Sequence, residues 1–221
     1  MWQWAERMAD LSANYDPMVR EQIESRGITN ARVLAAMSKV PRHEFVPEHL
    51  ADAAYEDHPL PIGYSQTISQ PYIVALMTEL LKLQPGAKVL EVGTGSGYQA
   101  AILAEVGAEV YSIEILEPLA RTSAELLRRL GYVNVQVKQG DGYLGWSQHA
   151  PYDAIVVTAA ADHVPPPLVE QLKPGGRLVI PVGDGQDQQS LLLVEKSTDG
   201  GVTTRDVAPV MFVPLTRENR E

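Results

Sequence analysis

The chain has 221 residues, no cysteine, and 18 lysines and arginines against 28 aspartates and glutamates, which gives a formal net charge of −10. This length suits one large domain, the missing cysteines exclude disulfides, thiolate metal sites and a cysteine nucleophile, and the acidic balance argues against a protein whose main task is to grip nucleic-acid phosphates. Because no apolar run is long enough to cross a membrane and residues 1–10 lack the pattern of a secretory signal, we expect a cytoplasmic protein without a membrane partner.

The first 80 residues predict helices and irregular segments that together form a cap. Helices are expected over residues 17–25 and 30–40, the second because its apolar residues recur at helical spacing. Residues 56–70 hold several prolines and few apolar anchors, which predicts a long loop. Pro71 then begins another helix, since proline is favoured at the first helical position.

From residue 88 onward, short apolar runs alternate with helical segments at 98–106 and 118–130. The expected strands are residues 88–92, 109–113, 133–137, 154–158, 177–181, 191–196 and 207–213. Alternation of strands and helices predicts a mostly parallel sheet with helices on both faces. The last two strands have no helix between them and predict an antiparallel edge. We therefore expect an α/β fold with a doubly wound sheet, in a single domain 1–221 that comprises the cap (1–80) and the sheet core (81–221).

The strongest chemical signal is a glycine-rich turn between the first strand and its helix. Gly93, Gly95 and Gly97 let a ligand approach the backbone, and Glu91 lies near the carboxyl end of the strand, where open sheets bind ligands. The spacing is Gly-x-Gly-x-Gly and not the dinucleotide fingerprint Gly-x-Gly-x-x-Gly, and the missing Gly-Lys-Ser/Thr excludes a P-loop. An acid directly before the glycines would repel a pyrophosphate, but it suits a cationic ligand such as a sulfonium.

Two further carboxylates end the next two strands. Glu114 follows the glycine turn by about 20 residues, where an acid can accept hydrogen bonds from ribose hydroxyls. Asp141, in Gly140-Asp141-Gly142, is placed to accept from an adenine amino group. Taken alone, Glu114 can be a solvated strand end or a contact to NAD, and Asp141 can belong to a plain turn. Together with the glycine turn they predict an adenosyl ligand.

These three segments resemble the class I S-adenosylmethionine-dependent methyltransferases, whose fold is Rossmann-like. Residues 63–72, Gly-Tyr-Ser-Gln-Thr-Ile-Ser-Gln-Pro-Tyr, are similar to the segment that marks protein-L-isoaspartate (D-aspartate) O-methyltransferases. Residues 41–47 (Pro-Arg-His-Glu-Phe-Val-Pro), 159–161 (Ala-Ala-Ala) and 212–216 (Phe-Val-Pro-Leu-Thr) are also similar to that family. The resemblance covers about residues 18–216, nearly the whole chain.

The resemblance implies a defined reaction and a set of site residues. The methyl group of S-adenosylmethionine passes to the α-carboxylate of an L-isoaspartyl residue in a damaged protein or peptide, leaving S-adenosylhomocysteine. The ester then closes to a succinimide without the enzyme. The implied catalytic residue is Ser69. Together with the strand-end acids, the expected cofactor contacts are Ile68, Ser69, Gln70, Pro71, Glu91, Gly93, Thr94, Gly95, Gly97, Glu114, Ile115, Asp141, Gly142 and Thr216.

The implied chemistry agrees with the residues available. A carboxylate is already ionised at neutral pH, so it needs no general base, and the enzyme acts by positioning. Ser69 is then a hydrogen-bond donor that orients the carboxylate, the N-terminal residue of a helix, or both; no Gly-x-Ser-x-Gly surrounds it, which argues against a hydrolase. The stretch 211–215 has two interpretations, an edge strand packed on the core or a strand-like peptide contact. On the second, the substrate contacts are Val213, Pro214 and Leu215.

Other classes of function remain as alternatives. One alternative is a methyltransferase that acts on a small molecule or on RNA, and the net charge of −10 argues against RNA as the substrate. A nicotinamide dehydrogenase on a similar sheet and a non-catalytic adenosyl-binding module also remain, although the Ser69 segment argues against the second. The histidines form no ligand pair, so we expect no metal, and no nucleic-acid partner. We expect a monomer, with Trp2 and Trp4 packed on the domain.

Overall fold

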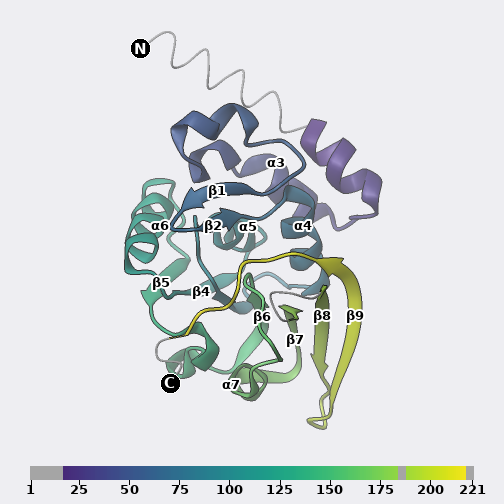
Figure 1. Ribbon diagram of the computed structural model, residues 1–221. Helices are drawn as coiled ribbons and strands as arrows, with labels where there is room; N and C mark the ends of the chain where they lie inside the picture. Colours follow the sequence, from purple (N-terminus) through teal and green to yellow (C-terminus); the bar gives the residue numbers. More distant parts are fainter. Residues whose placement is uncertain (1–16, 184–187, 218–221) are drawn as a thin grey trace.

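The computed structural model describes residues 17–183 and 188–217 (Figure 1). The expectation for Trp2 and Trp4 lies outside these residues. Within the described ranges, no helix combines the length and the apolar character that crossing a membrane requires.

A seven-stranded sheet runs through the centre of the fold in the order β5-β4-β3-β6-β7-β8-β9. Its strands are β3 (Lys88–Val92), β4 (Glu109–Glu114), β5 (Val135–Gln139), β6 (Tyr152–Val157), β7 (Leu172–Val182), β8 (Gln189–Lys196) and β9 (Val202–Val210). All pairs from β5 to β7 are parallel, whereas β8 and β9 pair antiparallel. The expected α/β class, with a mostly parallel sheet and an antiparallel edge, is therefore confirmed. Because β3 pairs with both β4 and β6, the strand order reverses at β3, which is where sheets of this kind bind ligands.

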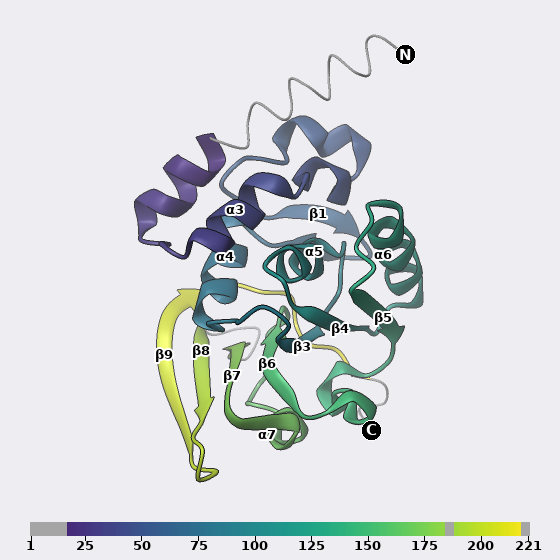
Figure 2. The same cartoon turned by 180° about the vertical axis from the view of Figure 1, so that it is seen from behind.

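Helices cover both faces of this sheet (Figures 1 and 2). They are α3 (Ala31–Lys39), α4 (Pro71–Leu80), α5 (Tyr98–Glu105), α6 (Glu117–Arg129) and α7 (Pro166–Gln171). Side chains of β3 alternate between the faces, so that Val89 packs with α3 to α6 in one apolar cluster, whereas Leu90 and Val92 pack with α7 in a second. The first cluster continues into the cap from Met18 onward, so the cap and the core share one apolar interior.

Several expectations about strand bounds were wrong in detail: β7 begins at Leu172 and not at 177, and β9 begins at Val202 and not at 207. The last strand was expected over 207–213, but β9 ends at Val210, which is paired with Gln189 at the start of β8. The chain then leaves the sheet and crosses the front of the molecule past β6 (Figure 1). The third strand was expected over 133–137 and lies two residues later, at Val135–Gln139.

The segment 56–70 is not the unstructured loop that its prolines predicted. It contains a hairpin of β1 (Leu60–Gly63) and β2 (Gln66–Ile68), joined by Tyr64 and Ser65. Both turn residues have positive φ, 53° and 57°, which matches the twist of a two-residue hairpin turn although neither residue is glycine or asparagine. The paired ends of the hairpin, Leu60 and Ile68, are buried and anchor it to the core. The chain passes from this anchor directly into Ser69 and α4.

Candidate active site

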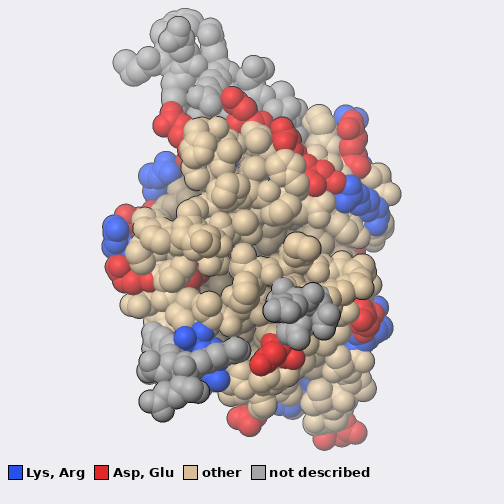
Figure 3. Space-filling view, in the orientation of Figure 1, with Lys and Arg blue, Asp and Glu red and all other residues tan. Residues whose placement is uncertain are grey.

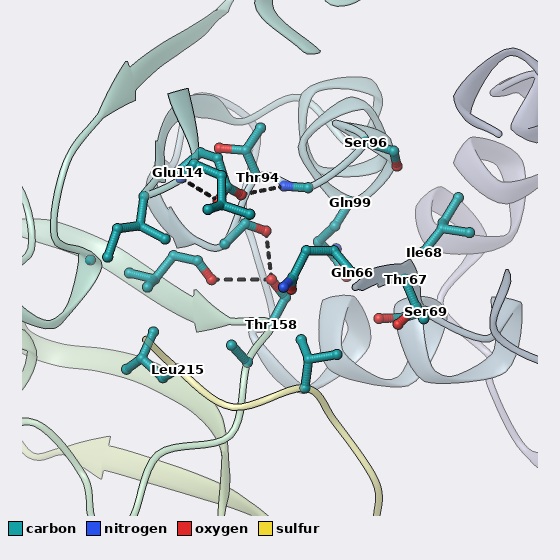
Figure 4. Close-up of a pocket in the computed structure, with 18 of the residues that line it drawn as sticks. Gln66, Thr67, Ile68, Ser69, Thr94, Ser96, Gln99, Glu114, Thr158 and Leu215 are labelled. Atoms are coloured by element: carbon teal, nitrogen blue, oxygen red, sulfur yellow. Dashed lines mark hydrogen bonds between the residues drawn. The ribbon is translucent and has the colours of Figure 1, made fainter. Parts of the chain in front are cut away.

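A cleft of about 760 Å³, counted with its open mouth, lies at the carboxyl ends of β3, β4 and β6. The hairpin bounds one side of it, and the segment that follows β9 bounds another. Figure 4 shows Gln66, Thr67 and Ser69 on the side opposite Glu114. The sequence-predicted residues that line this cleft are Ile68, Ser69, Gly93, Thr94, Gly95, Glu114, Ile115, Gly142, Val213, Pro214, Leu215 and Thr216.

Two glycines let the backbone lie close to its neighbours at the floor of the cleft. Gly93 has a φ of 96°, and a Cβ there would meet the hydroxyl of Thr158 at the end of β6. A Cβ on Gly142 would collide with Val92. Glycine at these two positions therefore lets the backbone pack closely against Thr158 and Val92.

Glu114 holds the loop between β3 and α5 in place. One carboxylate oxygen accepts from the backbone N–H of Gly95 at 2.8 Å, and the other accepts from the N–H of Leu116 at 3.0 Å. The side chain is only 6% exposed, and it still lines the cleft. Each carboxylate oxygen has a second lone pair, so Glu114 can accept further hydrogen bonds from a ligand in the cleft.

Glu91 does not line the cleft, although it lies in the strand that leads to the glycine turn. The side chain is fully buried, and one carboxyl oxygen accepts from the hydroxyl of Ser112, which in turn lies 2.5 Å from the hydroxyl of Thr94. The other carboxyl oxygen has no partner in the described part of the chain. Burial raises the pKa of Glu91 to about 8, so the carboxyl group is largely protonated at neutral pH. It reaches the cleft only through the hydroxyl of Thr94.

Four other sequence-predicted cofactor residues are not among those that line the cleft. Gly97 precedes α5 with a φ of 91° and backs onto Leu127. Gln70 donates from its side chain to the carboxylate of Asp57 at 2.8 Å. Pro71 is buried at the first position of α4. These three side chains support the segments that carry the neighbouring lining residues.

The fourth of these residues is Asp141, which begins the turn that carries Gly142. Its carboxylate accepts from the N–H of Tyr143 at 3.0 Å, and Nε of Arg217 lies 3.4 Å from its other oxygen. In this arrangement the carboxylate stabilises its own turn and contacts the C-terminal segment.

Ser69 lies where the cleft meets a second, shallower space. It is half-buried, and its hydroxyl has no hydrogen-bond partner among the residues that the structure describes. The second space is a groove of about 1950 Å³ that shares Thr67, Ser69 and Thr158 with the cleft and extends along 209–214. Within residues 17–183 and 188–217, no charged side chain lines this groove. Figure 3 shows the same face, mostly uncharged around its central hollow, with charged side chains towards the outside.

The segment after β9 is tied to the core by its backbone. The carbonyl of Val213 accepts from the N–H of Ala160 at 2.8 Å, and the N–H of Leu215 donates to the carbonyl of Ala160 at 2.7 Å. Phe212 is held on both sides by the amide of Gln189, at 2.6 Å and 3.0 Å. Within the described chain, the carbonyl of Pro214 and the backbone of Met211 keep unused hydrogen-bonding groups. Together with the N–H of Val213 and the carbonyl of Leu215, these groups of the described segment are left for a strand-like contact.

Sequence reasoning missed several residues that line the cleft. These residues are Gln66, Thr67, Val74, Val92, Ser96, Tyr98, Gln99, Ile113, Leu116, Thr158 and Ala159. Thr158 could have been found, because it ends β6, the other neighbour of β3 at the reversal of strand order. Gln66 and Thr67 could not, because the hairpin that carries them was interpreted as a loop. No three side chains that could hold a metal ion come together among the described residues.

The residues present fit S-adenosylmethionine. A buried carboxylate with unused lone pairs, a backbone that can be approached closely and the absence of any lysine or arginine among the lining residues suit a cationic, hydroxyl-rich ligand. A pyrophosphate would find no positive side chain here.

Glu91 predicts an unusual pH dependence of stability. The folded protein keeps this proton up to about pH 8, whereas the unfolded chain loses it near 4.5, so the free energy of unfolding falls as pH rises between these values. The slope is at most about 1.4 kcal/mol per pH unit. We expect Glu91→Gln to remove this contribution. The free energy of unfolding of the variant minus that of the parent, measured in urea, is expected to be larger at pH 8 than at pH 5. Glu109→Gln, at the exposed end of β4, is the control, and parallel pH profiles of Glu91→Gln and parent would contradict the assignment.

Comparison with known proteins agrees with this geometry. The family model of protein-L-isoaspartate (D-aspartate) O-methyltransferase matches residues 13–220. A relative from a Polaromonas species, a protein-L-isoaspartate O-methyltransferase 2, is 61% identical over 90% of this chain and 95% of its own length. The protein-L-isoaspartate O-methyltransferase of Gloeobacter violaceus is 58% identical over 91% of this chain and 98% of its own.

A solved protein-L-isoaspartate O-methyltransferase superposes with a TM-score of 0.81 at 30% identity, over 90% of this chain and 65% of its own. A Plasmodium falciparum protein assigned to the same activity, solved with S-adenosyl-L-homocysteine, superposes with a TM-score of 0.77 at 26% identity, over 92% of this chain and 99% of its own. The fold, cofactor and reaction expected from the sequence are thereby confirmed. The chain belongs to the protein-L-isoaspartate (D-aspartate) O-methyltransferase family, and it is an S-adenosylmethionine-dependent methyltransferase that acts on isoaspartyl residues of proteins and peptides.

Proposed function

We propose that the cleft binds the cofactor, that the groove binds the isoaspartyl segment, and that Ser69 orients the substrate carboxylate where the two spaces meet. The observation that carries this proposal is the position of Ser69, which lines both spaces with a hydroxyl that no described residue engages. Thr67 and Thr158 line both spaces as well, so the junction is polar while the groove beyond it has apolar and uncharged polar walls.

S-adenosylmethionine, when bound, supplies the methyl group on a positively charged sulfur. Glu114 accepts hydrogen bonds from the ribose hydroxyls, and Gly93 and Gly95 let the ligand approach the backbone. The other proposed contacts that line the cleft are Ile68, Ser69, Thr94, Ile115, Gly142 and Thr216. Gln70, Pro71, Glu91, Gly97 and Asp141 act one step away, by holding the segments that carry these residues.

The substrate carboxylate needs orientation, and it needs no activation, because it is ionised at neutral pH. The hydroxyl of Ser69 donates one hydrogen bond to a carboxylate oxygen and leaves the other oxygen free to face the cleft. The walls exclude much of the solvent there, so this single hydrogen bond is stronger than it would be in water. Positioning of this kind is enough to account for most of the acceleration of a bimolecular transfer.

The groove accounts for binding of polypeptide segments that differ in sequence. Among the described residues that line the groove none is charged, so flanking residues of either charge meet no fixed opposite or like charge from them. Val213 and Pro214 form one wall, Leu215 next to them lines the cleft, and the carbonyl of Pro214 is a backbone acceptor that this segment offers to a peptide N–H. The substrate backbone is therefore recognised at few points, and its side chains by shape.

We further infer a single domain 1–221 that acts as a monomer in the cytoplasm. The shared apolar cluster of cap and core supports one domain. The absence of cysteine agrees with a reducing compartment.

Ser69→Ala tests the central assignment. We expect kcat for an isoaspartyl peptide to fall by about 10- to 100-fold, the range for loss of one hydrogen bond to a charged group. The Kd of S-adenosylhomocysteine, measured by calorimetry, is expected to change by less than about threefold, since the cofactor keeps its other contacts. Ser65→Ala in the hairpin turn is the matched control, and the aspartyl twin of the peptide is the matched substrate. Equal methylation of both peptides would refute the function, and an unchanged kcat would refute the role of Ser69.

Glu114→Gln tests cofactor binding separately. An amide at this position offers an N–H₂ group to the N–H of Gly95 or Leu116 and loses the charge that strengthens both hydrogen bonds. We expect the Kd of S-adenosylhomocysteine to rise by about 10- to 100-fold. Glu109→Gln, on the same strand but at its other end, is expected to bind as the parent does. Equal affinities of Glu114→Gln and the parent would exclude Glu114 as a ribose contact.

Met211→Ala tests the groove. Met211 is 93% exposed and lines the groove without lining the cleft. We expect KM for isoaspartyl peptides with apolar flanking residues to rise by about two- to fivefold, from the loss of buried apolar area, with kcat and cofactor affinity unchanged. Val133→Ala, also highly exposed but outside the groove, is the control. If the KM of Met211→Ala changes no more than that of Val133→Ala, the peptide binds outside this groove.

A further inference from the structure

Arg42 is the one lysine or arginine that is buried among the described residues, and its side chain has no exposure. It lies in a helical turn of the cap, Arg42–Phe45, well before Ser69 in the sequence. Nε donates to the carbonyl of Ala54 at 2.7 Å, and Nη2 donates to the carbonyl of Ser69, also at 2.7 Å. The guanidinium group lies over the ring of Tyr98, 4.8 Å from its centroid.

This burial is expensive for a structural role alone. Burying a charged group costs several kcal/mol unless close partners compensate it. No carboxylate in the described part of the chain pairs with Arg42, and its partners are neutral carbonyls and an aromatic face. Burial accordingly lowers the pKa of Arg42 from its ordinary value. An apolar side chain of similar volume would fill this place without the desolvation penalty, so the guanidinium group does something that packing does not require.

The hydrogen bond from Arg42 to the carbonyl of Ser69 indicates the role of the guanidinium group. The hairpin pairing ends at Ile68, and the first carbonyl used by α4 is that of Gln70, which accepts from the N–H of Val74 at 3.2 Å. The carbonyl of Ser69 lies between these two elements, and Arg42 is its donor. With Ile68 buried on one side and the side chain of Gln70 bound to Asp57 on the other, this contact fixes the peptide plane of Ser69. The direction of its Cα–Cβ bond follows from that plane, and the hydroxyl is then limited to the staggered rotamers about this bond.

The same guanidinium group also contacts the sheet side of the site. Tyr98 is the first residue of α5, directly after the glycine turn, and it lines the cleft. Arg42 therefore joins the segment that carries Ser69 to the helix that begins at the glycine turn, through one rigid planar group.

We propose that Arg42 is a positioning residue for the methyl transfer, because its guanidinium group fixes the Ser69 peptide so that the hydroxyl faces the substrate carboxylate. This inference rests on the proposed role of Ser69. Arg42 makes no contact with the substrate itself. Its effect is on the fraction of bound substrate that is held in a reactive orientation, and so on kcat rather than on cofactor binding.

The test compares Arg42→Lys and Arg42→Met with Arg32→Lys and Arg32→Met. Arg32 is a matched control, because it also lies in the cap and donates from Nη2 to a backbone carbonyl, that of Leu83, which is outside the cleft. We expect Arg42→Lys, which keeps the charge and one donor, to fold and to lower kcat about tenfold, with KM for the peptide and Kd of S-adenosylhomocysteine within about threefold of the parent. Arg42→Met is expected to lower kcat further, and the Arg32 variants to leave it unchanged.

A double-mutant cycle separates this proposal from the one on which it rests. In a Ser69→Ala background, Arg42→Lys is expected to lower kcat by less than about twofold, because the group that it positions is gone. If Ser69→Ala alone leaves kcat unchanged, the role of Ser69 fails whatever Arg42 does. If Ser69→Ala lowers kcat but Arg42→Lys does not, or if the two losses multiply, the role of Arg42 fails. Loss of the folded state at 25 °C in both Arg42 variants, judged by circular dichroism, would also overturn it, since Arg42 would then be a structural residue.

Discussion

The parallel pairing of β3 with both β4 and β6 is the constraint on which the rest of the structure depends. Parallel strands end at the same edge of the sheet, so this pairing brings Gly93, Glu114 and Thr158 together although they lie far apart in the chain. Everything else is added to that edge. The cap contributes the hairpin and Ser69 from one side, and the segment after β9 contributes Val213 to Thr216 from another. On the proposed assignment, the sheet supplies the cofactor side of the cleft, and elements outside the sheet supply the substrate side.

How well each side could be predicted from the sequence follows this division. The glycine turn and Glu114 were predictable because they obey a rule of strand ends that needs no tertiary information. The hairpin was not predictable, because its turn residues Tyr64 and Ser65 adopt positive φ values although neither is glycine or asparagine, the residues that usually mark such a turn. Arg42 lies in a segment that resembles the family, but its contact with Ser69 could not be predicted, because a side chain that donates to a backbone carbonyl places no demand on the residue type of its partner. The end of β9 was misplaced because 211–213 remain extended after pairing stops.

Glu91 illustrates a further limit of sequence reasoning. An acid before the glycines suggests a direct contact to a cation, but the structure buries it behind Thr94 and Ser112 with its proton retained. A glutamine would avoid the penalty that this burial imposes on the folded state at neutral pH. Local departures of this kind are typical of functional sites. Periodicity identifies the strand correctly and says nothing about the ionisation state.

The uncharged groove has a consequence for how damaged proteins reach this enzyme. The net charge is −10, and the described residues of the groove include no lysine or arginine, so they give an approaching carboxylate no long-range attraction. Encounter is then set by diffusion and short-range fit. If the groove binds the isoaspartyl segment as proposed, that segment must leave its own fold to reach Ser69, and a mobile loop or terminus does so at a lower free-energy cost than a well-packed site.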